Sequence, residues 1–436
     1  MQSEFHQRQL AFGDLMLDNS VAIFTAAHEQ TRSRDTEYRF RQDSDFFYLT
    51  GFTEPDAWLV IKKHENQVSS TLFCRPKDEL AEIWHGRRLG ATAAVERLAI
   101  DQAFELSELD EELPKLLNHG AAVYFVLQQD PQAEQQLHQA LATLRQGSRH
   151  GWQAPNQIID WRPMLHEMRL FKSSQEIELM RKAAQISVDG HIRAMQQCRP
   201  GMWEYQLEAE ILHEFAMQGA RDAAYSTIVG GGDNACILHY TENESPLRDG
   251  ELVLIDAGAE FAGYAGDITR TFPVNGKFTP EQAAIYQLVL DAHDAALAAL
   301  GPGKSIKQAN DIVLQIMVSG LVKLGIMQGD VAELIEQQAY KAFYMHGLSH
   351  WIGLDVHDVG DYKSSDRSRT LEPGMAITVE PGLYISKSAE VDAKWQGIGV
   401  RIEDDVVITT EGIENLTAAV PKTIADIEAL MAKTNN

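Results

Sequence analysis

The sequence predicts an α+β protein in which a smaller mixed α/β domain, residues 1–172, precedes a larger domain, residues 173–436. Strand-like apolar runs dominate the first part of the chain. In the second part, two long helical segments with capping signals are each followed by a second helix. Apolar strands that end in acidic residues follow each helix pair, which predicts two related helix–helix–strand halves.

The first domain contains short runs rich in β-branched and aromatic residues, which are typical of strands. The runs expected to form strands are Val21–Phe24, Asp45–Phe52, Ala57–Ile61, Ser70–Phe73 and Ala122–Leu127. A helix is expected around Glu134–Leu144, and the turn-rich segment Gly151–Pro163 is expected to be a connection. The mixture of strands and helices predicts a small α/β domain.

The second domain opens with a long helix whose two ends are marked in the sequence. Ser173 and Glu176 form an S-x-x-E capping box, and the helix is expected to end after about Cys198, before a Pro-Gly pair. A second helix is expected from about Trp203 to Gly219.

The same order recurs further along the chain. Thr279 and Gln282 form a second capping signal, with proline at the first helical position. This helix is expected to end at Gly301–Gly303, and another to run from about Ser305 to Leu324. The recurrence predicts that the two halves are pseudo-symmetric.

Composition excludes several classes of function. The chain has 63 acidic and 38 basic residues, a formal charge of −25, whereas nucleic-acid binding needs clustered lysine and arginine. No apolar run approaches the ~18 residues of a membrane span, and the N-terminus lacks the features of a secretory signal. The three cysteines are widely spaced and form no CxxC pair. These features predict a cytoplasmic protein that binds neither nucleic acid nor membranes.

Four acidic residues lie in or beside strongly apolar strands of the second domain. They are Asp256, Asp267, Glu380 and Glu403. The first two are eleven residues apart, a spacing that suits two neighbouring strands joined by a short connection. The third ends an apolar strand before a Pro-Gly turn. The fourth shares one face of its expected strand with Arg401 and Asp405.

These four acids predict a metal centre. A single acid beside a turn is usually a turn former, but burying an unpaired carboxylate costs on the order of several kcal/mol, which bound cations would offset. A histidine from the segment containing His346, His350 and His357 would complete the set. Four carboxylates and one imidazole suit two divalent cations, above all Mn²⁺, with Co²⁺, Zn²⁺ or Fe²⁺ as alternatives.

Six motifs of the second domain resemble the creatinase/methionine aminopeptidase family, whose fold is called pita-bread. They span Ile228–Asn243, Leu252–Gly258, Gly263–Phe278, Phe343–Gly360, Leu371–Ile385 and Gly397–Thr409. The N-terminal motifs RQDSDFFYLTGFTEPDAWLV, AEIWHGRRLG and IDWRPMLHEMRLFKS extend the resemblance over essentially the whole chain. They make it specific for the bacterial aminopeptidase P (Xaa-Pro aminopeptidase) branch of this family.

The resemblance implies a role for each candidate residue. The implied metal ligands are Asp256, Asp267, His350, Glu380 and Glu403. The residues implied to act on or to bind the substrate are His357, Glu380, Arg401, His239 and His346. By resemblance, Asp267 and Glu403 bridge the two metals, and His357 contacts the substrate carbonyl. Glu380 is expected to shuttle a proton from water to the proline nitrogen.

The implied activity is hydrolysis of the bond between an N-terminal residue and a penultimate proline, by a hydroxide bridging the two metals. The partner is then a peptide with proline at its second position. The alternative is a prolidase, which cleaves Xaa-Pro dipeptides with the same ligands. A non-catalytic peptide-binding module and a metal-free, creatinase-like hydrolase are disfavoured, because all five ligand positions are retained.

Trp84 lies in AEIWHGRRLG, which is expected to be a polar loop. A tryptophan in such a loop is usually folded back onto its own domain. The resemblance implies instead that Trp84 reaches the active site of a neighbouring subunit in a homotetramer, where it contacts the first residues of the substrate.

Overall fold

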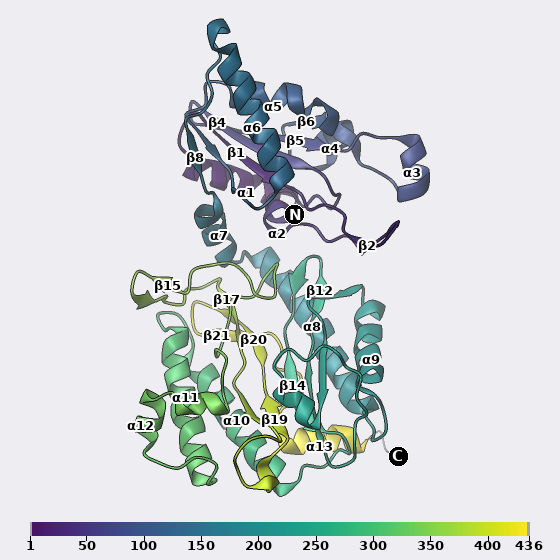
Figure 1. Ribbon diagram of the computed structural model, residues 1–436, viewed down its shortest axis with the longest axis vertical. Helices are drawn as coiled ribbons and strands as arrows, with labels where there is room; N and C mark the ends of the chain where they lie inside the picture. Colours follow the sequence, from purple (N-terminus) through teal and green to yellow (C-terminus); the bar gives the residue numbers. More distant parts are fainter. Residues whose placement is uncertain (1, 434–436) are drawn as a thin grey trace. The chain divides into compact units, whose positions relative to one another are not determined.

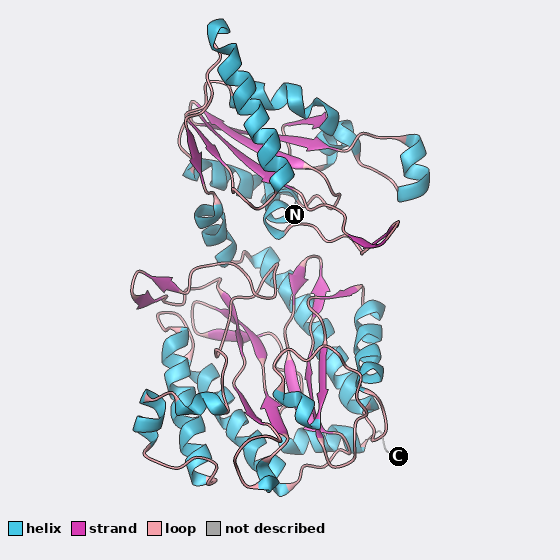
Figure 2. Ribbon diagram, in the orientation of Figure 1, coloured by secondary structure: helices cyan, strands magenta, loops and turns pink. Residues whose placement is uncertain are grey.

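The computed structural model describes residues 2–433. The chain divides into two compact units, Met1–Arg169 and Leu170–Asn436 (Figure 1). The predicted fold class is confirmed: the first unit is mixed α/β, and the second combines helix pairs with antiparallel strands (Figure 2).

A six-stranded sheet, in the order β6-β5-β4-β1-β7-β8, forms the centre of the N-terminal unit. Its strands are β1 (Ser20–Thr25), β4 (Trp58–His64), β5 (Gln67–Cys74), β6 (Gln102–Glu105), β7 (Ala122–Tyr124) and β8 (Gln157–Ile159). Strands β1, β4 and β5 pair antiparallel, whereas β6, β7 and β8 join in parallel. Strand β8 lies within the segment that was expected to be only a connection.

Most helices of this unit lie around the sheet, whereas helix α3 (Glu79–His85) and a short hairpin of β2 (Thr31–Ser33) and β3 (Thr36–Glu37) project from the unit (Figure 1). The helices are α1 (Gln2–Leu15), α2 (Ser44–Thr50), α3 (Glu79–His85), α4 (Gly90–Arg97), α5 (Leu109–Leu117), α6 (Pro131–Gln146) and α7 (Arg162–Leu170). Leucines of α5 and α6, among them Leu113 and Leu137, pack with Val21 and Val60 of the sheet in one buried cluster.

Two local predictions in this unit are wrong. The expected strand Asp45–Phe52 is helix α2, because Asp43 caps its N-terminus and Gly51, with φ of 62°, ends it. These caps override the strand propensity of the aromatic residues between them. The expected loop around Trp84 is helix α3, whose first turn is capped by the Asp78 carboxylate.

The C-terminal unit contains the two predicted helix pairs. They are α8 (Ser174–Gln197) with α9 (Glu204–Met217), and α10 (Pro280–Ala299) with α11 (Ile306–Lys323). The predicted capping boxes form: the Ser173 and Thr279 hydroxyls accept hydrogen bonds from the backbone N–H groups three residues later. Two shorter helices, α12 (Val331–Glu336) and α13 (Ile424–Ala432), complete the helical part.

The strands of this unit form several small antiparallel sheets between the helix pairs (Figure 1). They include β10 (Ile228–Gly231), β11 (Leu252–Asp256), β14 (Thr269–Pro273), β17 (Ala376–Val379), β18 (Gly382–Ile385), β19 (Ile398–Arg401), β20 (Asp404–Ile408) and β21 (Ile413–Asn415). Strands β11 and β14 are paired so that Asp256 lies opposite Thr269. Asp256 and Asp267 therefore lie at the same end of this strand pair, as their spacing predicted.

The strand expected to carry Arg401, Glu403 and Asp405 on one face is divided in two. Strand β19 ends at Arg401 and pairs with β18, whereas β20 begins at Asp404 and pairs with β17. Glu403 lies in the break, where its N–H donates to the carbonyl of Thr269. The break places Glu403 beside β14 instead of in a continuous strand.

Candidate active site

A cavity of about 540 Å³ in the C-terminal unit gathers nine of the ten candidate residues. These are His239, Asp256, Asp267, His346, His350, His357, Glu380, Arg401 and Glu403. Its volume lies within the usual range of small-molecule sites, roughly 300–1,000 Å³. Strand ends and connections far apart in the sequence thus deliver their polar side chains to one place.

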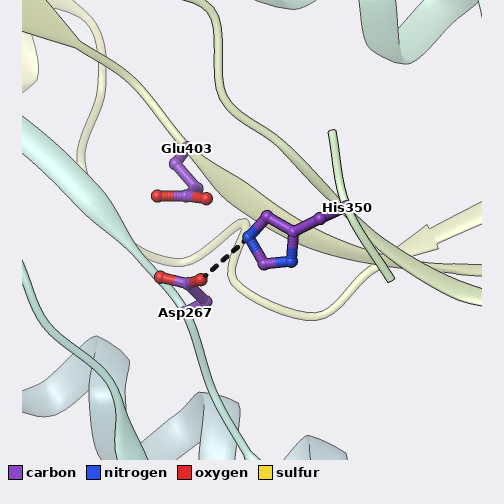
Figure 3. Close-up of side chains that lie close together, drawn as sticks. All are labelled: Asp267, His350 and Glu403. Carbon is purple, nitrogen blue, oxygen red and sulfur yellow. Dashed lines mark ion pairs between the residues drawn. The ribbon is translucent and has the colours of Figure 1, made fainter. Parts of the chain in front are cut away.

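Three of the proposed metal ligands form the tightest group (Figure 3). One potential ligand atom from each of Asp267, His350 and Glu403 lies within 4.8 Å of the others. His350 Nε2 is 3.4 Å from Asp267 Oδ2, and both acids are nearly fully buried. Such a set of oxygen and nitrogen donors suits a divalent transition metal.

The ring of His350 is held in the tautomer that metal binding requires. Its Nδ1 lies 2.9 Å from the carbonyl oxygen of Trp351. Because a carbonyl can only accept, Nδ1 carries a hydrogen, and Nε2 is the nitrogen that faces Asp267 and would bind a metal once it has lost its own hydrogen. Burial lowers the pKa of His350, but the hydrogen bond and charge of Asp267 and the charge of Glu380 raise it to about 9. The site therefore attracts positive charge.

The other two proposed ligands, Asp256 and Glu380, lie close to this group. The Asp256 carboxylate accepts from Arg401 Nη2 at 2.6 Å and from the Tyr225 hydroxyl at 2.5 Å. The Glu380 carboxylate lies 3.7 Å from His350 Nε2. All five side chains can thus reach a shared volume.

The carboxylates repel one another strongly. Burial, followed by the charges of its neighbours, raises the pKa of Asp267 and of Glu403. Burial also raises the pKa of Glu380 to about 7. Among the cavity-lining residues that the structure describes, Arg401 is the one arginine or lysine. Two divalent cations would supply the missing positive charge, so the donor set fits a dinuclear centre.

His346 and Arg401 are connected through one tyrosine. The Tyr384 hydroxyl lies 2.8 Å from His346 Nε2 and 3.0 Å from Arg401 Nη1. His346 Nδ1 lies 2.8 Å from the carbonyl oxygen of Gly347, so Nδ1 carries the hydrogen and Nε2 accepts from the tyrosine. Burial lowers the pKa of His346 to about 4, so this ring is neutral at pH 7.

His357 lies against the ring of His350, at a centroid distance of 4.3 Å. Burial and the neighbouring His350 and His239 lower the pKa of His357. A neutral imidazole keeps one N–H that can donate to a substrate oxygen.

Sequence reasoning missed two residues that organise the site. The Tyr225 hydroxyl lies between Asp256 and Asp267, 2.5 Å and 2.6 Å from their nearest oxygens. Glu204, at the start of α9, is fully buried. Neither belongs to a pattern that indicates function from the sequence, because both act on segments that become neighbours only in the fold.

The Glu204 carboxylate holds the segment that carries His239. Its four hydrogen-bond donors, at 2.8–2.9 Å, are Gly231 N, Asn234 Nδ2, Tyr240 Oη and Ser245 N. These donors lie within residues 231–245, before and after His239 in the sequence, and His239 lines the cavity. One buried carboxylate thus fixes the conformation of this wall.

Trp84 lies on α3 of the N-terminal unit, and its side chain is 82% exposed. Leu80 and Ile83 of the same short helix are 75% and 74% exposed. The tryptophan is therefore not folded back onto its own unit. Across residues 2–433, no helix is long and apolar enough to cross a membrane.

Comparison with known proteins agrees with this geometry. The model of metallopeptidase family M24 matches residues 178–410, and that of the aminopeptidase P N-terminal domain matches residues 5–124. The chain is 57% identical to an Xaa-Pro aminopeptidase of Escherichia coli, over 98% of this chain and 97% of the relative. It is 54% identical to the Xaa-Pro aminopeptidase of Haemophilus influenzae, over the same shares of the two chains.

Solved structures agree along the whole chain. Proline aminopeptidase P II from Yersinia pestis, 58% identical, superposes with a TM-score of 0.97 over 99% of this chain and 100% of that chain. Zinc-substituted E. coli aminopeptidase P in complex with product is 56% identical. It superposes with a TM-score of 0.98 over 100% of this chain and 99% of that chain. The chain therefore belongs to metallopeptidase family M24, in the branch that carries an aminopeptidase P N-terminal domain.

Proposed function

We propose that the chain is a metal-dependent Xaa-Pro aminopeptidase, which releases the N-terminal residue from peptides whose second residue is proline. The observation that carries this proposal is the convergence of Asp256, Asp267, His350, Glu380 and Glu403 in one cavity. The relatives named Xaa-Pro aminopeptidase, which match 98% of the chain, support this activity over that of a prolidase.

The side chains divide the chemistry among them. When bound, a pair of divalent cations lowers the pKa of a water and polarises the scissile carbonyl. Glu380 would accept a proton from the attacking water and deliver it to the proline nitrogen. Neutral His357 donates a hydrogen bond to the carbonyl oxygen as negative charge develops there.

The wall formed by His239, His346 and Arg401 suits a proline ring. Both ring nitrogens of His346 are used in hydrogen bonds, one with the carbonyl oxygen of Gly347 and one with the hydroxyl of Tyr384. Its ring carbons are therefore the atoms left to contact a substrate in the cavity. Proline has no N–H and a fixed ring, so its nitrogen needs no hydrogen-bond acceptor from the wall. A residue with an N–H at this position would leave that donor unpaired.

The finer features of the enzyme follow from the same observations. We propose Mn²⁺ as the metal, because the set is rich in carboxylate oxygen and contains one imidazole. We propose a homotetramer, because exposed Leu80, Ile83 and Trp84 form an apolar surface that a second subunit would cover. The free cysteines support a reducing compartment, the cytoplasm.

Metal analysis tests the proposed centre. We expect chelator-treated protein to be inactive, and activity to return with Mn²⁺ until two ions are bound per chain, as measured by mass spectrometry after gel filtration. Full activity in protein that contains no metal would contradict the proposal.

A further inference from the structure

A second cavity, of about 350 Å³, adjoins the candidate active site within the C-terminal unit. It lies among α11, the short helical turn η4 (Ala339–Ala342) and the hairpin of β15 (Lys363–Ser364) and β16 (Arg367–Ser368). The two cavities share His346, Gly347 and Ser349 as a common wall. None of the roles proposed above uses this second cavity.

The charge of the second cavity differs from that of the chain as a whole. Although the chain carries a net charge of −25, no aspartate or glutamate is among the described residues that line the cavity. Lys307, Lys341, Lys363 and Arg369 line it. Lys307 is paired with an aspartate on its own helix, whereas Lys341 and Lys363 form no ion pair with an acid within residues 2–433. These two ammonium groups favour an anionic ligand.

Two residues that line the cavity carry hydroxyls that are not used in hydrogen bonds among the described residues. The Tyr344 hydroxyl and the Ser349 hydroxyl are buried, and neither has a hydrogen-bond partner in the part of the chain that the structure describes. Because burying an unpaired hydroxyl is unfavourable, a ligand that accepts a hydrogen bond from it gains binding free energy. Tyr340 and Tyr362 add aromatic walls to these polar groups.

We propose that the second cavity binds the C-terminal carboxylate of short peptide substrates, an inference that rests on the proposed function. The proposed reaction itself supplies this anion, because every unblocked peptide ends in a carboxylate. Glu380 Oε2 lies 3.6 Å from His346 Nδ1, and the His346 ring lies 5.0 Å from the ring of Tyr344. The cavity thus begins one side chain away from the proposed ligands.

This arrangement predicts the length of peptide whose carboxylate reaches the second cavity. An extended peptide advances about 3.3 Å per residue, so two or three residues beyond the scissile bond span the shared wall. The carboxylate of a tri- or tetrapeptide then lies between the two lysines and accepts from Tyr344 and Ser349. A C-terminal amide retains the apolar contacts but loses the charge.

Paired substrates test the inference. We expect Ala-Pro-Ala-Ala to exceed its C-terminal amide in kcat/KM by about three- to fivefold, the range for partly exposed ion pairs. The double variant Lys341→Gln/Lys363→Gln should bring the acid-to-amide ratio close to one. The matched control Lys304→Gln/Lys323→Gln removes two exposed lysines that do not line the cavity, and it should keep the wild-type ratio.

Tyr344→Phe separates ligand binding from a structural role. It removes a hydroxyl that has no partner among the described residues, so the melting temperature should stay constant or rise while the acid-to-amide ratio falls. Binding of the same two peptides to chelator-treated protein, followed by intrinsic fluorescence, should give the same ranking without turnover. Identical ratios in wild type and the cavity variants would overturn the inference and leave Xaa-Pro cleavage intact. Failure of the proposed function would instead abolish cleavage of both peptides.

Discussion

The hydroxyl oxygen of Tyr225 lies 2.6 Å from Oδ1 of Asp267. The same oxygen lies 2.5 Å from Oδ1 of Asp256. A hydroxyl has one hydrogen and cannot donate to two ionised carboxylates at once. The hydroxyl hydrogen can therefore serve one of the two carboxyls at a time, and burial and the charge of Asp256 raise the pKa of Asp267. A cation bound by both carboxylates would compete with protons for them.

We expect metal to stabilise the protein more at pH 8 than at pH 5. Burial raises the pKa of Glu380 to about 7 from its ordinary value of 4.5. Between these values the folded metal-free protein binds more protons than the unfolded chain, so its stability falls as pH rises. Bound Mn²⁺ offsets the repulsion that appears at high pH. Calorimetry should show a rise in melting temperature on adding Mn²⁺ that is larger by about 5 °C at pH 8. An equal rise at both pH values would contradict this account.

Glu403→Ala should abolish peptide hydrolysis and reduce the bound metal without unfolding the protein. We expect this because Glu403 is only 2% exposed and its carboxylate belongs to the three-residue ligand group. Because the substitution also removes repulsion, the chelator-treated variant should melt no lower than chelator-treated wild type. Glu411→Ala, an exposed acid a few residues along, is the matched control and should keep full activity. Near-normal turnover with full metal content in the Glu403 variant would argue strongly against this site.

Glu204→Gln should raise KM for prolyl peptides by about tenfold, because the amide leaves buried donors of the 231–245 segment unpaired. His239 then loses its fixed position, while the metal ligands keep theirs. Metal content should equal that of wild type, and kcat should change less than KM. Glu214→Gln, on the same helix and paired with Arg193, is the control. A change in kcat or metal content alone would show that Glu204 does not act through this wall.

Trp84→Ala should weaken activity on short peptides and leave the metal content intact. In the proposed assembly, the exposed indole on α3 supplies contact to a substrate bound by another subunit. Trp152→Ala, a less exposed tryptophan of the same unit at 40%, should not affect activity. Light scattering should show a tetramer for the wild-type protein. A fully active monomer would refute the assembly without affecting the metal chemistry.

The parts of the fold that the sequence predicted best are those specified by local chemistry. Capping residues such as Ser173 and Thr279 fix helix starts through hydrogen bonds to the next turn, which a sequence reveals directly. The same kind of signal was overlooked at Asp43, where an aromatic run favoured a strand and the cap produced a helix. The break before Asp404 depends on contacts with β14 and was not visible in any local pattern.

In the candidate site, too, some residues could be predicted from the sequence and others could not. Acids such as Asp256 and Glu380 were detectable because a charge beside an apolar strand conflicts with burial unless something pairs with it. Tyr225 and Glu204 were not detectable from the sequence. A tyrosine, or a glutamate at the start of a helix, is ordinary in its local sequence and gives no sign of a functional role. Their importance arises from hydrogen bonds to distant residues that only the folded chain brings close.

The most direct test of the central claim is a comparison of three substrates with Mn²⁺-loaded protein, measured as release of the free N-terminal amino acid. We expect Xaa-Pro-Yaa tripeptides to be hydrolysed much faster than Xaa-Pro dipeptides, and Xaa-Ala-Yaa to be a poor substrate. Proline would then be selected at the second position by a site that admits a longer chain. Equal or faster hydrolysis of the dipeptides would identify a prolidase and contradict the account.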